Sequence, residues 1–463
     1  MIYIYNIKRE NIMKRKVMAL LLATALLATT ACGGSGANSE KTTSTESVEK
    51  TEDTESSAAV SEEAEDNSSE EVLDAETEKS EDESETENTE ESDGNNTEET
   101  TEKTEEEPES ETTSSDNSTG EDDMTQTPAW EIVSQMTIGW NLGNTLDAHE
   151  DSIKITDAPS KQETCWGNPE TTQEIIDAVL DLGFNTIRIP ITWKAHIDEN
   201  NNIDPAWMDR VQEVVDYAYN KGAFVIINVH HEDWNYPYYD NQDAASEKLA
   251  AIWTQVSERF KDYDTHLIFE LQNEPRKVGT DLEWNGGDKE GREVVNAVNM
   301  AGYEAIRASE GNNKNRLIMF PGYAASNQTN CLMAIKLPEN DDCVAVSVHS
   351  YTPYEFALQI PGRTTYDNDH GDLDRLLTDI NRIFFFKNVP VIIGEFGAMN
   401  KDNESERAEW VSYFLKKARE MNIPCIWWDN GQFDGSGENF GIIDRRTLEV
   451  PYPDLIKAIQ EYK

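Results

Sequence analysis

The chain has 463 residues and a formal net charge of -52 at pH 7. The segment from Thr125 to Lys463 holds all 11 Trp and is itself acidic, with 55 Asp and Glu against 30 Lys and Arg. A surface of this charge repels a phosphate backbone, so the composition argues against a nucleic-acid partner.

The first 32 residues are typical of an export signal. Basic residues at positions 14–16 precede the apolar run Val17–Ala28, which is too short for a permanent membrane span. Small residues then lead to Cys32, which resembles the lipid-modified cysteine of bacterial lipoprotein signals. Thr29 stands where such signals commonly carry Leu, so a plain secretory signal is the alternative. We therefore expect an exported protein, either anchored at the cell surface through a lipid on Cys32 or secreted.

An acidic segment follows from Gly33 to Met124, with 35 Asp and Glu against four Lys and no aromatic residue. Such a sequence cannot bury enough apolar surface to offset the entropy of ordering. We predict a disordered linker over residues 33–124 and a folded domain over residues 125–463.

Four further cysteines, Cys165, Cys331, Cys343 and Cys425, lie in the folded part. They show no CxxC or His-rich spacing of the kind that binds a metal. An exported protein could pair them, but free and buried cysteines are the simpler prediction.

Short β-rich runs alternate with amphipathic stretches through the folded part. The predicted strands are Thr137–Asn141, Thr186–Pro190, Phe224–Val229, Leu267–Leu271, Arg316–Phe320, Val344–His349, Val391–Glu395 and Cys425–Trp428. The predicted helices are Thr171–Leu182, Trp207–Asn220, Ala244–Phe260, Arg292–Ser309, Leu373–Phe386, Glu404–Glu420 and Asp454–Tyr462, with only Asn330–Ile335 available for the fifth connection. This alternation predicts an α/β fold of the (β/α)8 TIM-barrel type. A doubly wound open sheet is the alternative, but no Gly-rich phosphate loop follows the first strand, and polar residues gather where most strands end.

Two glutamates stand at the ends of predicted strands. Glu274 follows the fourth strand and Glu395 ends the seventh. A carboxylate there is costly unless it faces a polar cavity, and these strands lie on opposite sides of a barrel. Glycoside hydrolysis needs such a pair, and a separation near ~5 Å gives retention of configuration.

Short motifs surround these glutamates along the predicted domain. In chain order they are Gly139–Asp147, Cys165–Pro169, Gly183–Pro190, His230–Glu232, Asn273–Pro275, Ser347–Tyr351, Ile393–Phe396 and Trp427–Gly431. Together they resemble the motifs of glycoside hydrolase family 5, and in particular those of its subfamily-4 endoglucanases. They extend over most of the predicted domain in the order that the family has.

The resemblance implies a role for each matching residue. Glu395 is the expected nucleophile, Arg188 would keep it ionised and Tyr351 would hold its rotamer. Glu274 is the expected general acid and base, which the charge of Glu395 should keep protonated by raising its pKa. Asn273 would bind the sugar 2-hydroxyl.

Further residues are expected to bind sugar. His230 and His349 would line the same subsite. Neighbouring residues of a strand point to opposite faces, so either Trp427 or Trp428 enters the site, and the resemblance favours Trp428 as the platform under the sugar ring.

The remaining candidate residues are expected farther from the two catalytic glutamates. Asn144, Asp147 and Trp166 are expected to bind sugar in outer subsites, although Asn144 could be a turn residue and Trp166 a core residue. His231 is expected near the site. The run His230–Glu232 also invites a metal interpretation, which we do not favour because adjacent strand residues diverge and no third ligand is in sight.

We therefore predict a retaining endo-β-1,4-glucanase that needs no cofactor, acts as a monomer and meets a membrane only through Cys32. A xyloglucanase, lichenase, mannanase or xylanase of the same family is the nearest alternative, because single hydroxyl contacts decide such specificity. A surface polysaccharide-binding lipoprotein would not need the complete catalytic set. A transporter's solute-binding lipoprotein would need two lobes, which the eightfold alternation does not support.

Overall fold

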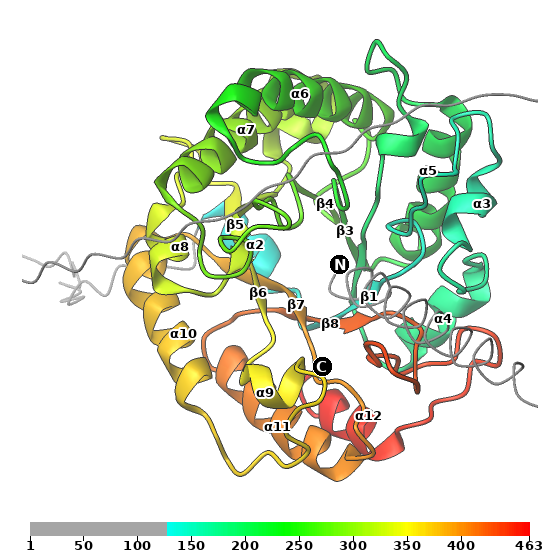
Figure 1. Cartoon of the computed structure of the whole chain (residues 1–463), viewed down its shortest axis with the longest axis vertical. Coiled ribbons are helices and arrows are strands. Elements are labelled where there is room, and N and C mark those ends of the chain that lie inside the picture. The colour runs from blue at the N-terminus through cyan, green and yellow to red at the C-terminus, as the bar shows by residue number, and fades with distance from the viewer. Residues whose placement is uncertain (1–126) are drawn as a thin grey trace, which may run out of the picture. The chain divides into compact units, whose positions relative to one another are not determined.

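Eight parallel strands close into a barrel in chain order, and helices surround it (Figure 1). The computed structural model describes residues 127–463, so the predicted signal, lipidation site and acidic linker lie outside the described residues. The strands are β1 (Ile138–Leu142), β2 (Thr186–Ile189), β3 (Phe224–Asn228), β4 (Leu267–Glu270), β5 (Ile318–Ser326), β6 (Val344–Ser350), β7 (Val391–Phe396) and β8 (Cys425–Asp429). Pairing of β1 with β8 closes the ring. The TIM-barrel prediction is confirmed, and the open sheet is excluded.

A helix follows each strand. These are α4 (Gln173–Asp181), α5 (Pro205–Tyr219), α6 (Gln242–Arg259), α7 (Lys289–Ala308), α8 (Thr329–Ala334), α10 (Gly371–Ile383), α11 (Glu404–Arg419) and α12 (Pro453–Gln460). All eight were predicted, including the short α8. The sequence did not predict α2 (Pro128–Val133), α3 (Pro159–Glu163), α9 (Tyr354–Ala357) or the 3-10 turns Lys194–His196, Tyr239–Asn241, Gly311–Asn315 and Phe385–Lys387. Elements this short show too little periodicity to be recognised.

The inside of the barrel is apolar toward its N-terminal end. Its floor is built from Phe224, Ile226, Ile268, Leu317, Met319, Cys343, Ala345, Ile392 and Ile426, and α2 adds Ala129, Ile132 and Val133 to the same cluster. Because side chains alternate along a strand, the inward positions nearer the C-terminal ends lie above this floor. There the inward residues become polar, which places the site at the C-terminal mouth.

Other features bear on the sequence predictions. The four cysteines between residues 127 and 463 are free, and all but Cys165 are buried. Over that same range, no helix combines the length and apolar character that a membrane crossing requires.

Candidate active site

Arg188 of β2 organises the polar layer above the floor. Its Nε lies 2.8 Å from Glu270 Oε2, and its Nη1 lies 2.9 Å from Glu395 Oε1. Nη1 also donates to Asn141 Oδ1 and Nη2 to Asn273 Oδ1, both at 2.8 Å. Arg188 is fully buried and does not line the cavity. It therefore lies beneath the site and contacts Glu395 rather than a bound sugar.

Glu270 is the carboxylate that balances this arginine. It is fully buried at the end of β4. Burial opposes its charge, but Arg188, His349 and Ser347 outweigh that effect and lower its pKa to about 2. A side chain on Gly394 would come within 3.1 Å of Ser347 Oγ and 3.3 Å of Glu270 Oε1. Glycine at this position therefore leaves room for the side chains of Ser347 and Glu270.

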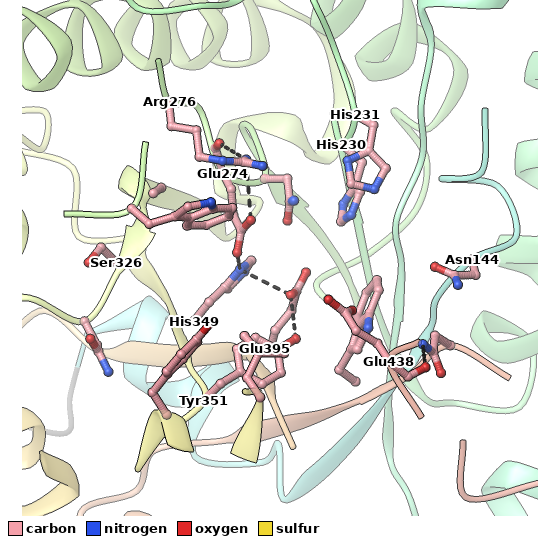
Figure 2. Close-up of a pocket in the computed structure, with 18 of the residues that line it drawn as sticks. Asn144, His230, His231, Glu274, Arg276, Ser326, His349, Tyr351, Glu395 and Glu438 are labelled. Atoms are coloured by element: carbon pink, nitrogen blue, oxygen red, sulfur yellow. Dashed lines mark hydrogen bonds and ion pairs between the residues drawn. The ribbon is translucent and has the colours of Figure 1, made fainter. Parts of the chain in front are cut away.

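The two predicted catalytic carboxyl groups converge above this layer (Figure 2). His349 Nδ1 lies 2.8 Å from Glu274 Oε1 and 3.4 Å from Glu395 Oε2, and oxygens of the two glutamates lie within 4.8 Å of each other. The Tyr351 hydroxyl donates to Glu395 Oε2 at 2.9 Å. A separation of this size suits direct attack on a sugar and retention of configuration.

The protonation of Glu274 differs from the prediction. Burial disfavours a charge on Glu274, but His349 and Arg276 outweigh burial, so its pKa is lowered rather than raised. Burial raises the pKa of Glu395, against the influence of His349 and Arg188. Burial alone would lower the pKa of His349, but the charge of Glu395 and the other nearby carboxylates raise it to about 9. At neutral pH the proton beside Glu274 is therefore carried by His349.

The cavity over these residues has a volume of about 960 Å³, which is enough for more than one sugar ring by the usual size of ligand pockets. Ten of the twelve predicted site residues line it, namely Asn144, Trp166, His230, His231, Asn273, Glu274, His349, Tyr351, Glu395 and Trp428. Asp147 does not, although it was expected to bind sugar. It is fully buried, and its Oδ1 accepts from the Thr145 backbone N–H. Asp147 therefore supports the wall of the cavity from behind.

The choice between the two tryptophans of β8 is clear in the structure. Trp428 lines the cavity, with its ring parallel to that of His230 at a centroid distance of 6.0 Å. Trp427 is fully buried and packs edge to face against Phe396 and Trp410. The alternation of strand side chains explains this division.

Within the described residues, two sets of three histidine and carboxylate side chains lie close enough together to share a metal ion. One set is Glu274, His349 and Glu395, and the other is Asp147, His230 and His231. Glu232 belongs to neither, because its carboxylate accepts from the Trp193 backbone and the Trp234 indole. Both sets offer donors that a cation such as zinc accepts, but in the first set these donors are the groups that glycoside hydrolysis requires.

Several site residues were not predicted. Arg276 and Glu438 line the cavity, and so does Trp284. Glu270 could have been predicted from the sequence, because a carboxylate within the apolar strand Leu267–Glu270 needs a buried cation as its partner. The others lie in loops, where the sequence carries no periodicity that would place them.

A closed (β/α)8 barrel that brings two carboxyl groups to this spacing over a sugar-sized cavity is a glycoside hydrolase of the retaining type. The comparisons identify the family. A family model described as "Cellulase (glycosyl hydrolase family 5)" matches residues 146–434, and the chain belongs to this family.

Individual relatives agree with this assignment. The chain is 47% identical over 344 residues to "Endoglucanase B" of Neocallimastix patriciarum, covering 73% of each chain. It is similar to the structure of a GH5-4 broad specificity endoglucanase from Ruminococcus champanellensis with bound cellotriose, with 44% identity, a TM-score of 0.70, and coverage of 73% of this chain and 99% of that one. It is also similar to a xyloglucan-specific endo-β-1,4-glucanase of the family from a metagenomic library, with 38% identity, a TM-score of 0.69, and coverage of 72% and 98%. The resemblance to family 5 and its subfamily 4 is thereby confirmed.

Proposed function

We propose that the chain is an endo-β-1,4-glucanase that hydrolyses internal bonds of cellulose and related β-glucans by double displacement. The observation that carries this proposal is the triangle of Glu274, His349 and Glu395, in which the oxygens of two carboxyl groups lie within 4.8 Å at the mouth of a barrel. The similarity to endoglucanases, one of them with bound cellotriose, supports a β-glucan as the substrate.

In the first step, a Glu395 oxygen attacks the anomeric carbon of the sugar that rests on Trp428. The bond to the leaving sugar breaks, its oxygen takes a proton from Glu274, and a glycosyl ester forms on Glu395. Arg188 and Tyr351 orient Glu395 through bonds of 2.9 Å each.

The proton for this step comes from His349. Its raised pKa depends on the charge of Glu395, and that charge disappears when the ester forms. The pKa of His349 therefore falls as the reaction advances, and its proton moves across the 2.8 Å contact to Glu274. In the second step, Glu274 takes a proton from water, the hydroxide attacks the anomeric carbon, and Glu395 is released.

Asn273 is oriented for the sugar by Arg188. Its Oδ1 accepts from Arg188 Nη2 at 2.8 Å, which leaves its amide N–H groups free to donate toward the cavity. A donor at this position suits a hydroxyl of the reacting sugar, which we assign as the 2-hydroxyl.

The central test replaces each catalytic carboxyl. Glu274→Gln and Glu395→Gln should each abolish the release of reducing ends from carboxymethylcellulose while the circular dichroism spectrum is retained. The exposed Glu409→Gln on α11 is a matched control and should retain activity. Wild-type activity in either catalytic variant contradicts the proposal.

The preferred polymer within this class is a separate question. Product release from cellulose, mixed-linkage glucan, xyloglucan, mannan and xylan compares the alternatives directly. Xyloglucan is included because one similar structure, 38% identical, is a xyloglucan-specific endo-β-1,4-glucanase. We expect the highest rate of product release from unbranched β-1,4-glucan. A binding protein without activity would leave every polymer intact.

We further propose that the enzyme is exported, anchored through Cys32 at the cell surface and active as a monomer. This location is supported by the N-terminal sequence, which has basic residues at 14–16, the apolar run Val17–Ala28 and then Cys32. A lipid mass on the N-terminal cysteine of the mature protein is expected, and Cys32→Ser should release the enzyme from the membrane fraction. An unmodified mature N-terminus contradicts the anchor but not export.

A further inference from the structure

Three arginine side chains of the described residues are fully buried, namely Arg188, Arg316 and Arg407. Arg188 is balanced by two carboxylates, those of Glu270 and Glu395. Arg316 donates from its two Nη atoms to four backbone carbonyls. For Arg407, neither Nη1 nor Nη2 has a hydrogen-bond partner among the described residues. Its guanidinium therefore differs from the other two in how its charge is compensated.

The guanidinium of Arg407, which lies on α11, keeps its charge at neutral pH although it is buried. Burial lowers its pKa from 12.5 to about 10. Its Nε donates to the Ala398 carbonyl at 2.9 Å, but within residues 127–463 the N–H groups of both Nη atoms have no acceptor. A buried charge without a partner is strongly destabilising, and buried donors that the protein leaves unpaired indicate a bound ion or water.

The carboxylates closest to this guanidinium are bound to other groups. Glu404 and Asp429 act on Arg407 through their charge, but neither forms an ion pair with it among the described residues. Glu404 Oε1 accepts from two backbone N–H groups at the start of α12, and Asp429 pairs with Arg445 at 3.0 Å. The described part of the chain therefore supplies no carboxylate to balance Arg407.

Two aromatic rings enclose the guanidinium. Its carbon lies 4.7 Å from the ring centroid of Tyr452 and 5.7 Å from that of Trp427. Figure 1 shows α11 and α12 side by side on the outside of the barrel, and Tyr452, directly before α12, is partly exposed. Aromatic faces stabilise a cation only weakly and leave its N–H groups unpaired. The enclosure also excludes a large organic anion.

We propose that Arg407 binds a small monovalent anion such as chloride through Nη1 and Nη2, between α11 and the turn before α12. One negative charge balances the guanidinium, which a neutral water molecule cannot do. The site is separate from the catalytic cavity, because neither Arg407 nor Tyr452 lines that cavity. Arg407 also holds the carbonyl of Ala398, in the segment that leaves β7. The bound anion therefore stabilises the junction of β7 and α11.

The thermal stability of the protein should depend on chloride through Arg407. We compare unfolding in sodium chloride and in sodium gluconate at equal ionic strength, since gluconate is too large for the site. The Tm of the wild type should be higher in chloride by roughly 2–5 °C, because only the folded protein binds the ion. Arg407→Met has a similar volume without the charge and should lose this difference. Arg419→Met, at the exposed end of the same helix, should retain it.

A bromide derivative tests the site without any variant. In crystals of the wild type grown from sodium bromide, anomalous scattering should give a peak beside Nη1 and Nη2 of Arg407, and this peak decides the question if Arg407→Met does not fold. An equal Tm of the wild type in both salts, an undiminished chloride response of Arg407→Met, or a water molecule in place of the bromide peak overturns the proposal. None of these measurements involves hydrolysis, so their outcome is independent of the proposed function.

Discussion

His349 Nδ1 lies 2.8 Å from Glu274 Oε1, and this contact joins the catalytic acid to a histidine that is charged at neutral pH. The same ring lies 3.4 Å from Glu395 Oε2. One buried imidazolium therefore stands between two carboxyl groups whose charges would otherwise repel each other. The protonation of the pair depends on His349 as much as on either glutamate.

The first prediction concerns stability as a function of pH. The pKa of His349 is raised from an ordinary value of 6.5 to about 9 in the folded protein. Its stabilising contribution is therefore complete below pH 6.5 and is lost as the pH rises through about 9. Urea unfolding over this range should show a steeper loss of stability for the wild type than for His349→Asn.

His266→Asn is the control for that experiment. His266 is partly exposed, and its Nδ1 lies 3.0 Å from Asp264 Oδ1. This variant should follow the pH dependence of the wild type. If His349→Asn also follows it, His349 is not the charged group between the glutamates.

The second prediction concerns the hydroxyl of Tyr351. Burial and the charge of Glu395 raise its pKa well above 10, so the phenol remains a donor to Glu395. A hydrogen bond to a charged group contributes about 1.5–3 kcal/mol. Tyr351→Phe should lower kcat roughly tenfold to a hundredfold with little change in KM. Tyr413→Phe removes a comparable bond to Asp374 on the outside of the barrel and should leave kcat unchanged.

The third prediction concerns the pair of Arg188 and Glu270. Both side chains are fully buried, with a closest contact of 2.7 Å. Glu270→Gln leaves the arginine with Glu395 as its only carboxylate among the described residues, and loss of one partner of a buried pair costs about 3–5 kcal/mol. We expect this loss in urea unfolding at neutral pH.

The difference between Glu270→Gln and the wild type should also narrow in acid. The folded-state pKa of Glu270 is about 2 against an ordinary value of 4.5, so its contribution is present above pH 4.5 and is lost as the pH falls toward 2. Glu409→Gln on the surface of α11 is the control of equal charge. A constant difference across this range contradicts the assignment.

The sequence predicted the barrel well because alternation is a repeated signal. Eight apolar strands, each followed by a helical stretch, leave few topologies, and Glu274 and Glu395 gain meaning from their place at strand ends. The sequence could not show that Arg188 is shared between Glu395 and Glu270. That depends on which inward positions of β2, β4 and β7 face one another, and therefore on strand register.

The sequence also could not predict which loop residues face the cavity. Asp147 stands three residues after Asn144 in one motif, yet Asn144 lines the cavity and Asp147 is buried behind it. The direction of the pKa shift of Glu274 also depended on distances, because it required His349 at 2.8 Å rather than Glu395 alone. The spacing of residues along a sequence does not predict distances between side chains in the folded protein.

The fourth prediction concerns Glu438, a third carboxyl group that lines the cavity from the loop after β8. Figure 2 shows it across the cavity from Glu274. Burial raises its pKa, and the charges of Glu274 and Glu395 raise it further. Influence between charges is mutual, so an ionised Glu438 raises the pKa values of the catalytic pair in turn.

Glu438→Gln removes that charge, so the pKa values of the pair should fall. Because burial and the neighbouring carboxylates raise the pKa of Glu438, its charge acts mainly on the alkaline side, where His349 must still hold the proton that it passes to Glu274. A profile of kcat/KM from about pH 4 to pH 9 should therefore show its alkaline limb displaced to lower pH and its acid limb little changed. Glu449→Gln, an exposed change of equal charge in the stretch before α12, should leave both limbs in place. Displacement of the alkaline limb to higher pH would mean that Glu438 does not act on the pair through its charge.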